Sequence, residues 1–216
     1  MDGVLYDSMA SHARAWKETM ASFGVPSELE DFYLLEGRTG VSTINLLFQR
    51  TFGHEATGDE LQLIYKEKSR LFEQLEYPES RPMPGAWAVL QKVRDLGLQR
   101  TIVTGSGQTS LFEKIEKHYP DVFDKALMVT AFDVQFGKPH PEPYLMGLKK
   151  LHLKPEEAIV VENAPLGVES ARSAGIFTVA VNTGPLPDQI LLTAGANALY
   201  PTMQALADDF ETLFGM

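Results

Sequence analysis

A change of pattern near residue 80 constrains the fold more than any other feature. Between residues 8 and 79 the apolar residues recur at helical spacing, and no run of β-branched residues typical of a strand appears. After the proline-containing segment 77–85, short apolar runs alternate with helical stretches. This alternation predicts a parallel sheet covered by helices on both faces. We therefore expect an α/β core formed by residues 1–7 and 80–216, with residues 8–79 as a helical insertion.

The same patterns predict the individual elements. The first helix should cover residues 8–23, with Asp7 or Ser8 as its N-cap and Gly24 as its stop. Strands are expected at 100–103, 126–130, 158–161 and 178–181, and helices at 86–96, 141–151 and 166–174.

Composition excludes several classes of function. The net charge is −10 and the pI is near 5, which argues against a nucleic-acid or anionic-membrane partner. There is no cysteine, so disulfides and thiolate chemistry are excluded. No stretch approaches 18 apolar residues, and no signal-peptide pattern follows Met1. We expect a monomeric cytoplasmic protein that acts on a small molecule.

Polar residues gather where the predicted strands end. Thr104-Gly105 follows one strand and Glu162-Asn163 follows another, while Asp2-Gly3 lies at the start of the chain. Open parallel sheets bind ligands beyond the carboxyl ends of their strands. Lys138 lies in the segment 136–141, where two prolines and a glycine restrict the backbone. Taken singly, each residue would more often be a turn or surface residue, so their common placement carries the argument.

In this order, the four segments resemble the four motifs of the haloacid dehalogenase superfamily of phosphotransferases. The resemblance implies a Rossmann-like parallel sheet with an inserted helical cap. It also implies that Asp2 is the general acid and base, and that Lys138 is the cation beside the phosphoryl group. Thr104 and the backbone N–H of Gly105 would hold phosphate oxygens, with Ser106 beside the substrate.

The resemblance further implies a magnesium site. Glu162 and Asn163 match the acidic pair that holds Mg²⁺ in this superfamily, together with the backbone carbonyl of Asp2. Many relatives carry Asp in place of Asn163. An amide oxygen is still an acceptable ligand, since Mg²⁺ prefers oxygen donors and keeps several waters.

The first motif of the superfamily is Asp-x-Asp-Gly-x after a buried strand, and its first Asp attacks phosphorus. If Asp2 is the second Asp, the first would lie one position before Met1, together with that strand. We therefore expect residues 1–216 to lack the nucleophile and to be impaired. A truncated start is favoured over a non-catalytic domain that binds phosphate ligands or a partner protein.

Within the insertion, His12 and Trp16 match the β-phosphoglucomutase-like branch, and His12 and Lys68 are candidate substrate-binding residues. The mutases carry Lys at the position of Glu36 and Arg at the position of Gly40, so the clamp for a second sugar phosphate is missing here.

Glu36 is therefore a candidate metal ligand, and Arg38 is a candidate replacement cation at the substrate. The cap loop 35–40 looks like that of inorganic pyrophosphatase-type members of the branch. The sequence thus favours hydrolysis of inorganic pyrophosphate or a small phosphate ester. The alternative is mutase activity on glucose phosphates.

Overall fold

The computed structural model describes residues 1–76, 81–107, 111–213 and 215. Its central sheet has the order β3-β4-β5, with β3 at Ile159–Glu162, β4 at Phe177–Val181 and β5 at Ala198–Tyr200. Both pairings are parallel, and Glu162 at the end of β3 lies beside Ala180 of β4. This arrangement confirms the predicted α/β class, and two of its strands match the predicted ones within one residue.

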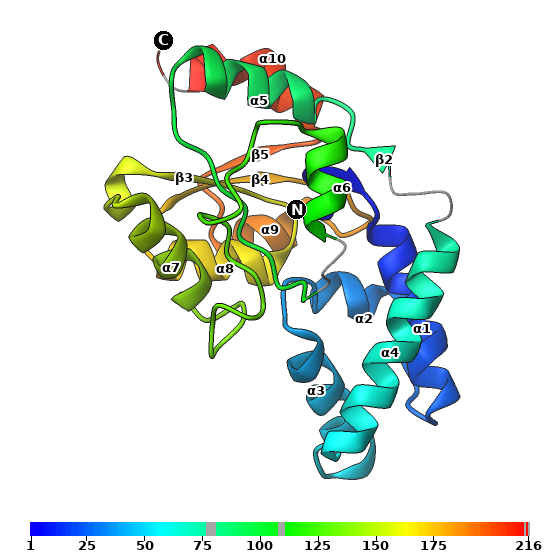
Figure 1. Ribbon diagram of the computed structural model, residues 1–216. Helices are drawn as coiled ribbons and strands as arrows, with labels where there is room; N and C mark the ends of the chain where they lie inside the picture. The colour runs from blue at the N-terminus through cyan, green and yellow to red at the C-terminus, as the bar shows by residue number, and fades with distance from the viewer. Residues whose placement is uncertain (77–80, 108–110, 214, 216) are drawn as a thin grey trace.

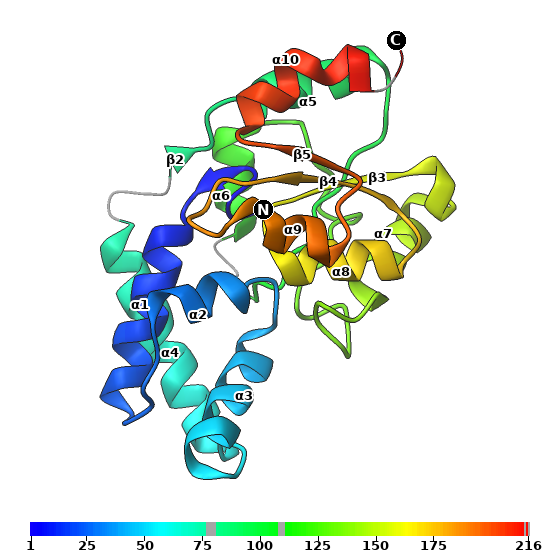
Figure 2. The ribbon, with the colours of Figure 1, turned by 180° about the vertical axis from the view of Figure 1, so that it is seen from behind.

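Helices cover both sides of this sheet (Figures 1 and 2). On one side lie α5 (Ala86–Asp95) and α10 (Met203–Leu213); on the other lie α7 (Glu142–Leu151), α8 (Pro165–Ser173) and α9 (Asp188–Ala194). A further helix, α6, covers Leu111–His118, and a short 3₁₀ helix, η1, covers Pro155–Glu157. Helices α5, α7 and α8 match the predicted ranges within about a residue, whereas α6, α9, α10 and β5 were not predicted.

Two of the predicted strands are wrong as regular strands. The segments 100–103 and 126–130 pair only through one parallel bridge, between Val103 and Val129. Two backbone hydrogen bonds hold it: Val129 N donates to Ile102 O at 2.8 Å, and Thr104 N donates to Val129 O at 2.9 Å. Among the described residues no strand pairs with the other edge of Val103. Each segment has one short partner strand, and this is not enough to form a regular ladder of backbone hydrogen bonds.

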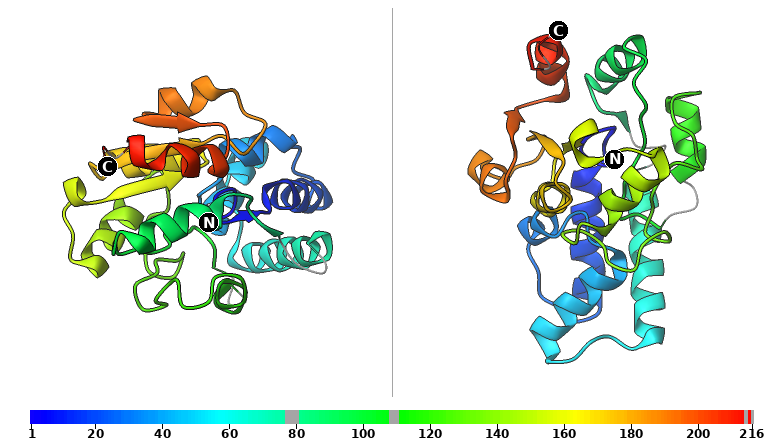
Figure 3. Two further views of the ribbon diagram at one scale, coloured as in Figure 1. Left: turned by 90° about the horizontal axis from the view of Figure 1, so that it is seen from above. Right: turned by 90° about the vertical axis from the view of Figure 1, so that its left-hand side faces the viewer.

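Four helices form the insertion: α1 (Met9–Ser22), α2 (Leu29–Leu34), α3 (Gly40–Phe52) and α4 (Gly58–Leu75). They share an apolar cluster of their own, which includes Met20, Ile44 and Leu47. Figure 3 shows them together at one end of the molecule, away from α5 and α10. The predicted boundaries of the insertion stay a prediction, and the one at residue 79 lies outside the described residues.

A small antiparallel pair lies where the insertion joins the core. Strand β1 (Tyr6–Asp7) pairs with β2 (Arg81–Pro82), and Met83 N donates to Leu5 O at 2.8 Å. Part of the segment 77–85, predicted as a linker, is therefore paired; its residues 77–80 lie outside the described residues. The chain thus leaves the core and returns to it along two neighbouring strands.

The start of α1 corrects one further prediction. Ser8 occupies the N-cap position, but its side chain makes no hydrogen bond to the helix backbone. Its hydroxyl instead donates to Asp2 Oδ1 at 2.5 Å, and Asp7 is exposed. The backbone of Ser8, with φ −122° and ψ −5°, departs from the extended conformation usual at an N-cap, so the residue expected as a cap contacts the candidate site instead.

Candidate active site

One cavity of about 100 Å³ lies between the helical insertion and the carboxyl ends of the core strands. Every residue singled out by the sequence lines it. From the core these are Asp2, Thr104, Gly105, Ser106, Lys138, Glu162 and Asn163, and from the insertion His12, Glu36, Arg38 and Lys68. The chain folds so that residues up to 161 positions apart meet at this one place; their individual roles stay predictions.

The carboxylate of Glu162 is held by four donors. Its Oε1 accepts hydrogen bonds from Lys138 Nζ and from the Tyr144 hydroxyl, both at 2.5 Å. Its Oε2 accepts from the backbone N–H groups of Asn163 at 3.0 Å and Ala164 at 3.4 Å. Burial alone would raise the pKa of Glu162, but the charge of Lys138 and these bonds lower it to about 2. The group is therefore a fixed carboxylate at neutral pH.

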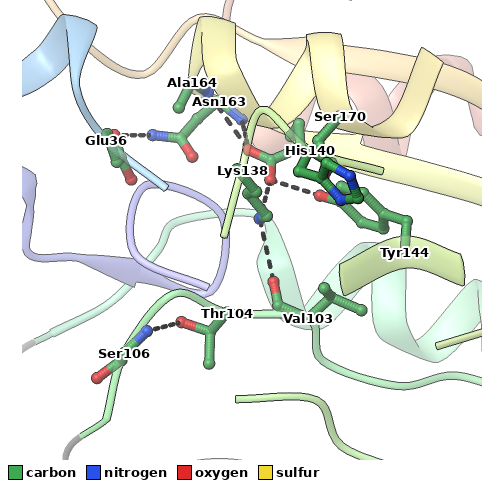
Figure 4. A network of polar contacts seen from close by, with 11 residues as sticks. Glu36, Val103, Thr104, Ser106, Lys138, His140, Tyr144, Asn163, Ala164 and Ser170 are labelled. Atoms are coloured by element: carbon green, nitrogen blue, oxygen red, sulfur yellow. Dashed lines mark hydrogen bonds and ion pairs between the residues drawn. The ribbon is translucent and has the colours of Figure 1, made fainter. Parts of the chain in front are cut away.

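Lys138 connects the two parts of the core. Its ammonium donates to Glu162 on β3 and, at 3.2 Å, to the carbonyl of Val103 in the bridged segment (Figure 4). It also lies 4.9 Å from the ring centroid of Tyr144. The side chain is only 5% exposed, so water screens its charge little. This geometry places a cation at the cavity, as the sequence predicts.

Asp2 lies at the hinge between core and insertion. Besides Ser8, its Oδ1 contacts His12 Nε2 at 3.3 Å. Burial favours the neutral acid, but the contacts with His12, the positive charge of the N-terminus and the hydrogen bond from Ser8 together outweigh it, so the pKa of Asp2 lies below its usual value. The residue is a carboxylate here, which suits the base half of the predicted role.

A buried lysine reaches Asp2 through His12. Lys68 Nζ lies 2.8 Å from His12 Nδ1, and the His12 ring stacks on Phe72 at 3.9 Å. Because an ammonium can only donate, we assign the ring proton of neutral His12 to Nε2, facing Asp2. Burial lowers the pKa of Lys68 to about 8, and the charge of Asp2 opposes that fall. The three residues form one chain of hydrogen bonds from α4 to the start of the chain.

Glu36 reaches the core from the loop between α2 and α3. Its Oε2 accepts a hydrogen bond from Asn163 Nδ2 at 3.0 Å (Figure 4), and among the described residues it forms no ion pair. Burial raises the pKa of Glu36 well above its ordinary value, and the negative charges of Glu162 and Asp2 add to the effect. Three acidic groups thus face one small cavity, and one of them has no cationic partner in the described part of the chain.

The loop after Val103 approaches the insertion closely. Thr104 Oγ1 accepts from Ser106 N at 3.1 Å, which holds the turn (Figure 4). A Cβ atom at Gly105 would lie 2.6 Å from Gly37 O and 2.8 Å from Arg38 O. Only glycine allows this contact between core and cap loop.

Arg38 is incompletely partnered. Its Nη1 donates to Ser42 Oγ at 2.9 Å, while its buried Nε has no hydrogen-bond partner. A buried donor of this kind is costly when it stays unpaired. Arg38 also lines the cavity, although its Nε itself is shielded from solvent.

Two tyrosines of the site were missed by sequence reasoning. Tyr144 lies six residues after Lys138, and its hydroxyl faces Glu162. Tyr65 lies three residues before Lys68 on α4, so helical spacing places both on one face. That spacing could have identified Tyr65, whereas nothing in the sequence pairs Tyr144 with Glu162.

The donor set agrees with a hard divalent cation, although no three His, Cys, Asp or Glu side chains of the described residues form a metal-binding group by themselves. Carboxylates from Glu36 and Glu162 and the amide of Asn163 line the cavity. Asn163 donates its side-chain N–H to Glu36, and its Oδ1 accepts nothing from the described residues. Mg²⁺ takes such mixed oxygen ligands and retains water in the remaining positions.

A parallel α/β core with an inserted helical cap, and with these groups at the ends of its strands, defines the class: an enzyme that handles phosphate. Residues 1–181 match the sequence profile of the family described as haloacid dehalogenase-like hydrolase. The chain belongs to this family, in its β-phosphoglucomutase-like branch, as the sequence predicted.

Individual similar proteins support this family membership. Hexitol phosphatase A of Escherichia coli is 34% identical over 189 residues, covering 84% of this chain and 80% of that protein. A phosphorylated carbohydrates phosphatase of Thermotoga maritima is 29% identical over 201 residues, covering 92% of this chain and 90% of the relative. A solved structure of a candidate β-phosphoglucomutase from Bacteroides vulgatus is 50% identical, with a TM-score of 0.95, and covers 100% of this chain and 86% of that one.

These similarities confirm the prediction of a phosphatase-type enzyme at the level of the family. The names of these relatives refer to carbohydrate phosphates as substrates, and none of them names an inorganic pyrophosphatase. No helix among the described residues is long and apolar enough to cross a membrane.

Proposed function

We propose that this protein is a Mg²⁺-dependent phosphohydrolase that acts on a small phosphate compound through an aspartyl-phosphate. One observation carries the proposal: Asp2, Thr104, Lys138 and Glu162 line one cavity, which Glu36 from the insertion also lines. Forming a covalent intermediate divides one difficult displacement into two easier steps. In the motif that the family shares, the attacking carboxylate belongs to the aspartate two positions before the one that Asp2 matches.

The first step requires Asp2 to be protonated, in contrast to the carboxylate form favoured without substrate, and Asp2 then gives this proton to the departing oxygen. In the second step the carboxylate of Asp2 takes a proton from the water that cleaves the aspartyl-phosphate. His12 holds Asp2 in place by its contact at 3.3 Å. Thr104 and the N–H of Gly105 bind phosphoryl oxygens, and Lys138 compensates their charge.

Glu36, Glu162, Asn163 and the backbone carbonyl of Asp2 would hold Mg²⁺. When bound, the ion neutralises the negative charge of the phosphoryl group. The four donors to Glu162 keep its carboxylate oriented without the ion. Closure of the insertion over the core excludes water that would compete with the substrate.

Two substrate classes are proposed. The first is a small phosphate ester, since the relatives are described by carbohydrate phosphates. The second is inorganic pyrophosphate, which is favoured by a carboxylate, Glu36, in the cap wall where a sugar bisphosphate would need a cation. Mutase activity is disfavoured for the same reason.

The experiment measures phosphate release from pyrophosphate and from a series of phosphate esters, with Mg²⁺. Residues 1–216 are compared with the same chain extended by an apolar strand and an aspartate before Met1. Activity only in the extended chain is the expected result. Equal activity in both would contradict the aspartyl-phosphate and require Asp2 or metal-bound water as nucleophile. Activity in neither would favour a non-catalytic phosphate-binding domain.

A further inference from the structure

The carboxylate of Glu162 is enclosed by two helices of the core. From α7, the hydroxyl of Tyr144 donates to its Oε1 at 2.5 Å. At the start of α8, the backbone N–H groups of Asn163 and Ala164 donate to its Oε2 at 3.0 and 3.4 Å. Together with Lys138 these groups restrain both oxygens, so the carboxylate is fixed in rotation as well as in position.

Helix α8 packs closely against the same side chain. A Cβ atom built on Gly167, in the first turn of α8, would overlap the carboxyl group of Glu162. Glycine is therefore the residue that lets the helix approach this carboxylate. Since Oε2 is held on the side of α8, the orientation of the group depends on what holds Oε1.

Tyr144 contacts both partners of the buried ion pair (Figure 4). Its hydroxyl and the ammonium of Lys138 donate to the same oxygen, Glu162 Oε1, and Lys138 Nζ lies 4.9 Å from the centroid of the Tyr144 ring. A hydroxyl has one proton to donate, so Tyr144 commits it to this carboxylate. One turn further along α7, a Cβ atom at Gly147 would lie 3.1 Å from Val103 Cγ2, so the helix also packs against the bridged segment.

The orientation of Glu162 determines where the charge of Lys138 lies. An ammonium has three N–H bonds, and the described residues accept two of them, at Glu162 Oε1 and at Val103 O. The remaining N–H belongs to a side chain that lines the cavity. If Glu162 rotated, Lys138 would follow its oxygen, because water screens a buried pair little. The hydroxyl of Tyr144 opposes that rotation without adding a charge.

We propose that Tyr144 is a positioning residue of the active site: its hydroxyl fixes the orientation of Glu162, so that Lys138 presents its remaining N–H to the phosphoryl group and Glu162 keeps one orientation toward the metal. The inference rests on the proposed function and adds a residue that acts through Glu162. Tyr144 does not touch the reacting atoms and transfers no proton. Groups that orient a metal ligand in this way typically contribute about 10–100-fold to metal affinity or activity.

The test has two readouts. Calorimetry measures the dissociation constant of Mg²⁺ on residues 1–216, and steady-state kinetics measure kcat and KM of phosphate release by the extended chain. The variants are Tyr144→Phe, which removes only the hydroxyl, and Gly167→Ala, which displaces the carboxylate from the opposite side. Thermal melts set a temperature at which every variant is folded.

A second tyrosine supplies the matched control. Tyr200 of β5 donates its hydroxyl to a carboxylate, Asp209 Oδ2, at 2.6 Å, and neither residue lines the cavity. Tyr200→Phe therefore removes the same kind of hydrogen bond from the core without changing the site. It should keep the affinity for Mg²⁺ and kcat within twofold of wild type.

Tyr144→Phe should weaken Mg²⁺ binding at least tenfold and lower kcat at least tenfold, with KM within threefold of wild type. A loss of this kind removes an interaction that matters in the transition state more than in substrate binding. Gly167→Ala should weaken Mg²⁺ binding in the same direction, because it moves the same carboxylate.

Three results would overturn the proposal. They are a folded Tyr144→Phe variant within twofold of wild type in both readouts, a rise in KM at unchanged kcat, and equal losses in Tyr144→Phe and Tyr200→Phe. If the wild-type chain binds no Mg²⁺ and the extended chain releases no phosphate, the proposed function fails. If wild type binds Mg²⁺ and the extended chain is active, but Tyr144→Phe changes neither, only this inference fails.

Discussion

On the core side of the cavity, every charged group has a partner that fits it: Glu162 has four donors, and Lys138 has a carboxylate and a carbonyl. On the insertion side the partners are incomplete. Glu36 has an amide and no ion pair among the described residues, and the buried Nε of Arg38 has no acceptor. The core wall is organised before anything binds, whereas the insertion wall is completed by what binds.

This difference separates two tasks. A preorganised set of charges is what phosphoryl transfer needs, because it avoids reorganisation during the reaction. Incompletely partnered groups are what selection needs, because they distinguish ligands that satisfy them from ligands that do not. The predictions below test the difference by changing one wall at a time.

The largest effect should come from Lys138→Met, which keeps the length of the side chain and removes its charge. Glu162 would then be a buried carboxylate without a cation, at a cost of about 3–5 kcal/mol in the free energy of unfolding. Urea denaturation at pH 7 measures it. The double variant Lys138→Met/Glu162→Gln should recover part of the loss. A single variant within about 0.5 kcal/mol of wild type would refute the account of a preorganised core wall.

Asp2→Asn should lower the rate of phosphate release by the extended chain about 10²–10⁴-fold. The amide keeps an acceptor for Ser8 and removes the proton-transfer group. Because the folded state favours the Asp2 carboxylate, stability should also fall, and the rate is compared under conditions where both proteins are folded. Steady-state kinetics measure the rate, and denaturation supplies the control. Full activity in this variant would exclude Asp2 as the acid and base.

Tyr144→Phe should cost about 1.5–3 kcal/mol of stability, because it removes one hydrogen bond to a charged carboxylate. The loss should shrink to about 0.5–1.5 kcal/mol, as for a neutral hydrogen bond, in a Glu162→Gln background, because the amide oxygen still accepts from the hydroxyl. Additive losses in the double variant would show that the hydroxyl of Tyr144 does not act through the charge of Glu162.

The smallest effect concerns Glu36 and pH. Its folded pKa is raised, so the stabilisation by the protonated form is complete below the ordinary Glu value and is lost as pH rises through the folded pKa. In EDTA, wild-type stability should therefore fall across this window by at most about 1.4 kcal/mol per pH unit from this group. Glu36→Gln should lack that slope. Parallel curves for the two proteins would mean that Glu36 does not face the other acids.

Adding Mg²⁺ sharpens the same comparison. The ion should stabilise the wild-type chain more than Glu36→Gln in thermal melts, because the insertion wall gains the cation that it lacks. An equal shift in both proteins would remove Glu36 from the proposed ligands.

The sequence predicts the meeting of Thr104, Lys138 and Glu162 because topology alone brings the carboxyl ends of parallel strands to one edge. It predicts β3 and β4 from their runs of apolar residues, which in β4 are buried on both faces after the exposed Phe177. It fails for 100–103 and 126–130, where the local pattern is equally strand-like. A regular strand needs a pairing partner as well as a suitable sequence of its own, and the local sequence pattern does not indicate whether that partner is present.

The side-chain partners were harder to predict than the site itself. Ser8 is a good N-cap by type, yet its backbone is not in the extended conformation of a cap, and its hydroxyl donates to Asp2. Tyr144 and Tyr65 resemble ordinary core aromatics in the sequence. Their contacts with Glu162 and Gly40 depend on how α7, α3 and α4 pack, which helical periodicity does not specify.

The pairing of β1 with β2 has a consequence for how such proteins diversify. The two junctions of the insertion lie side by side, so any segment whose ends are close together can occupy the same place without rethreading the core. The core can keep one chemistry while the inserted segment is replaced, lengthened or shortened. The substrate range can then change when the inserted segment at the β1–β2 junction is exchanged, while the strands that carry the reacting groups stay the same.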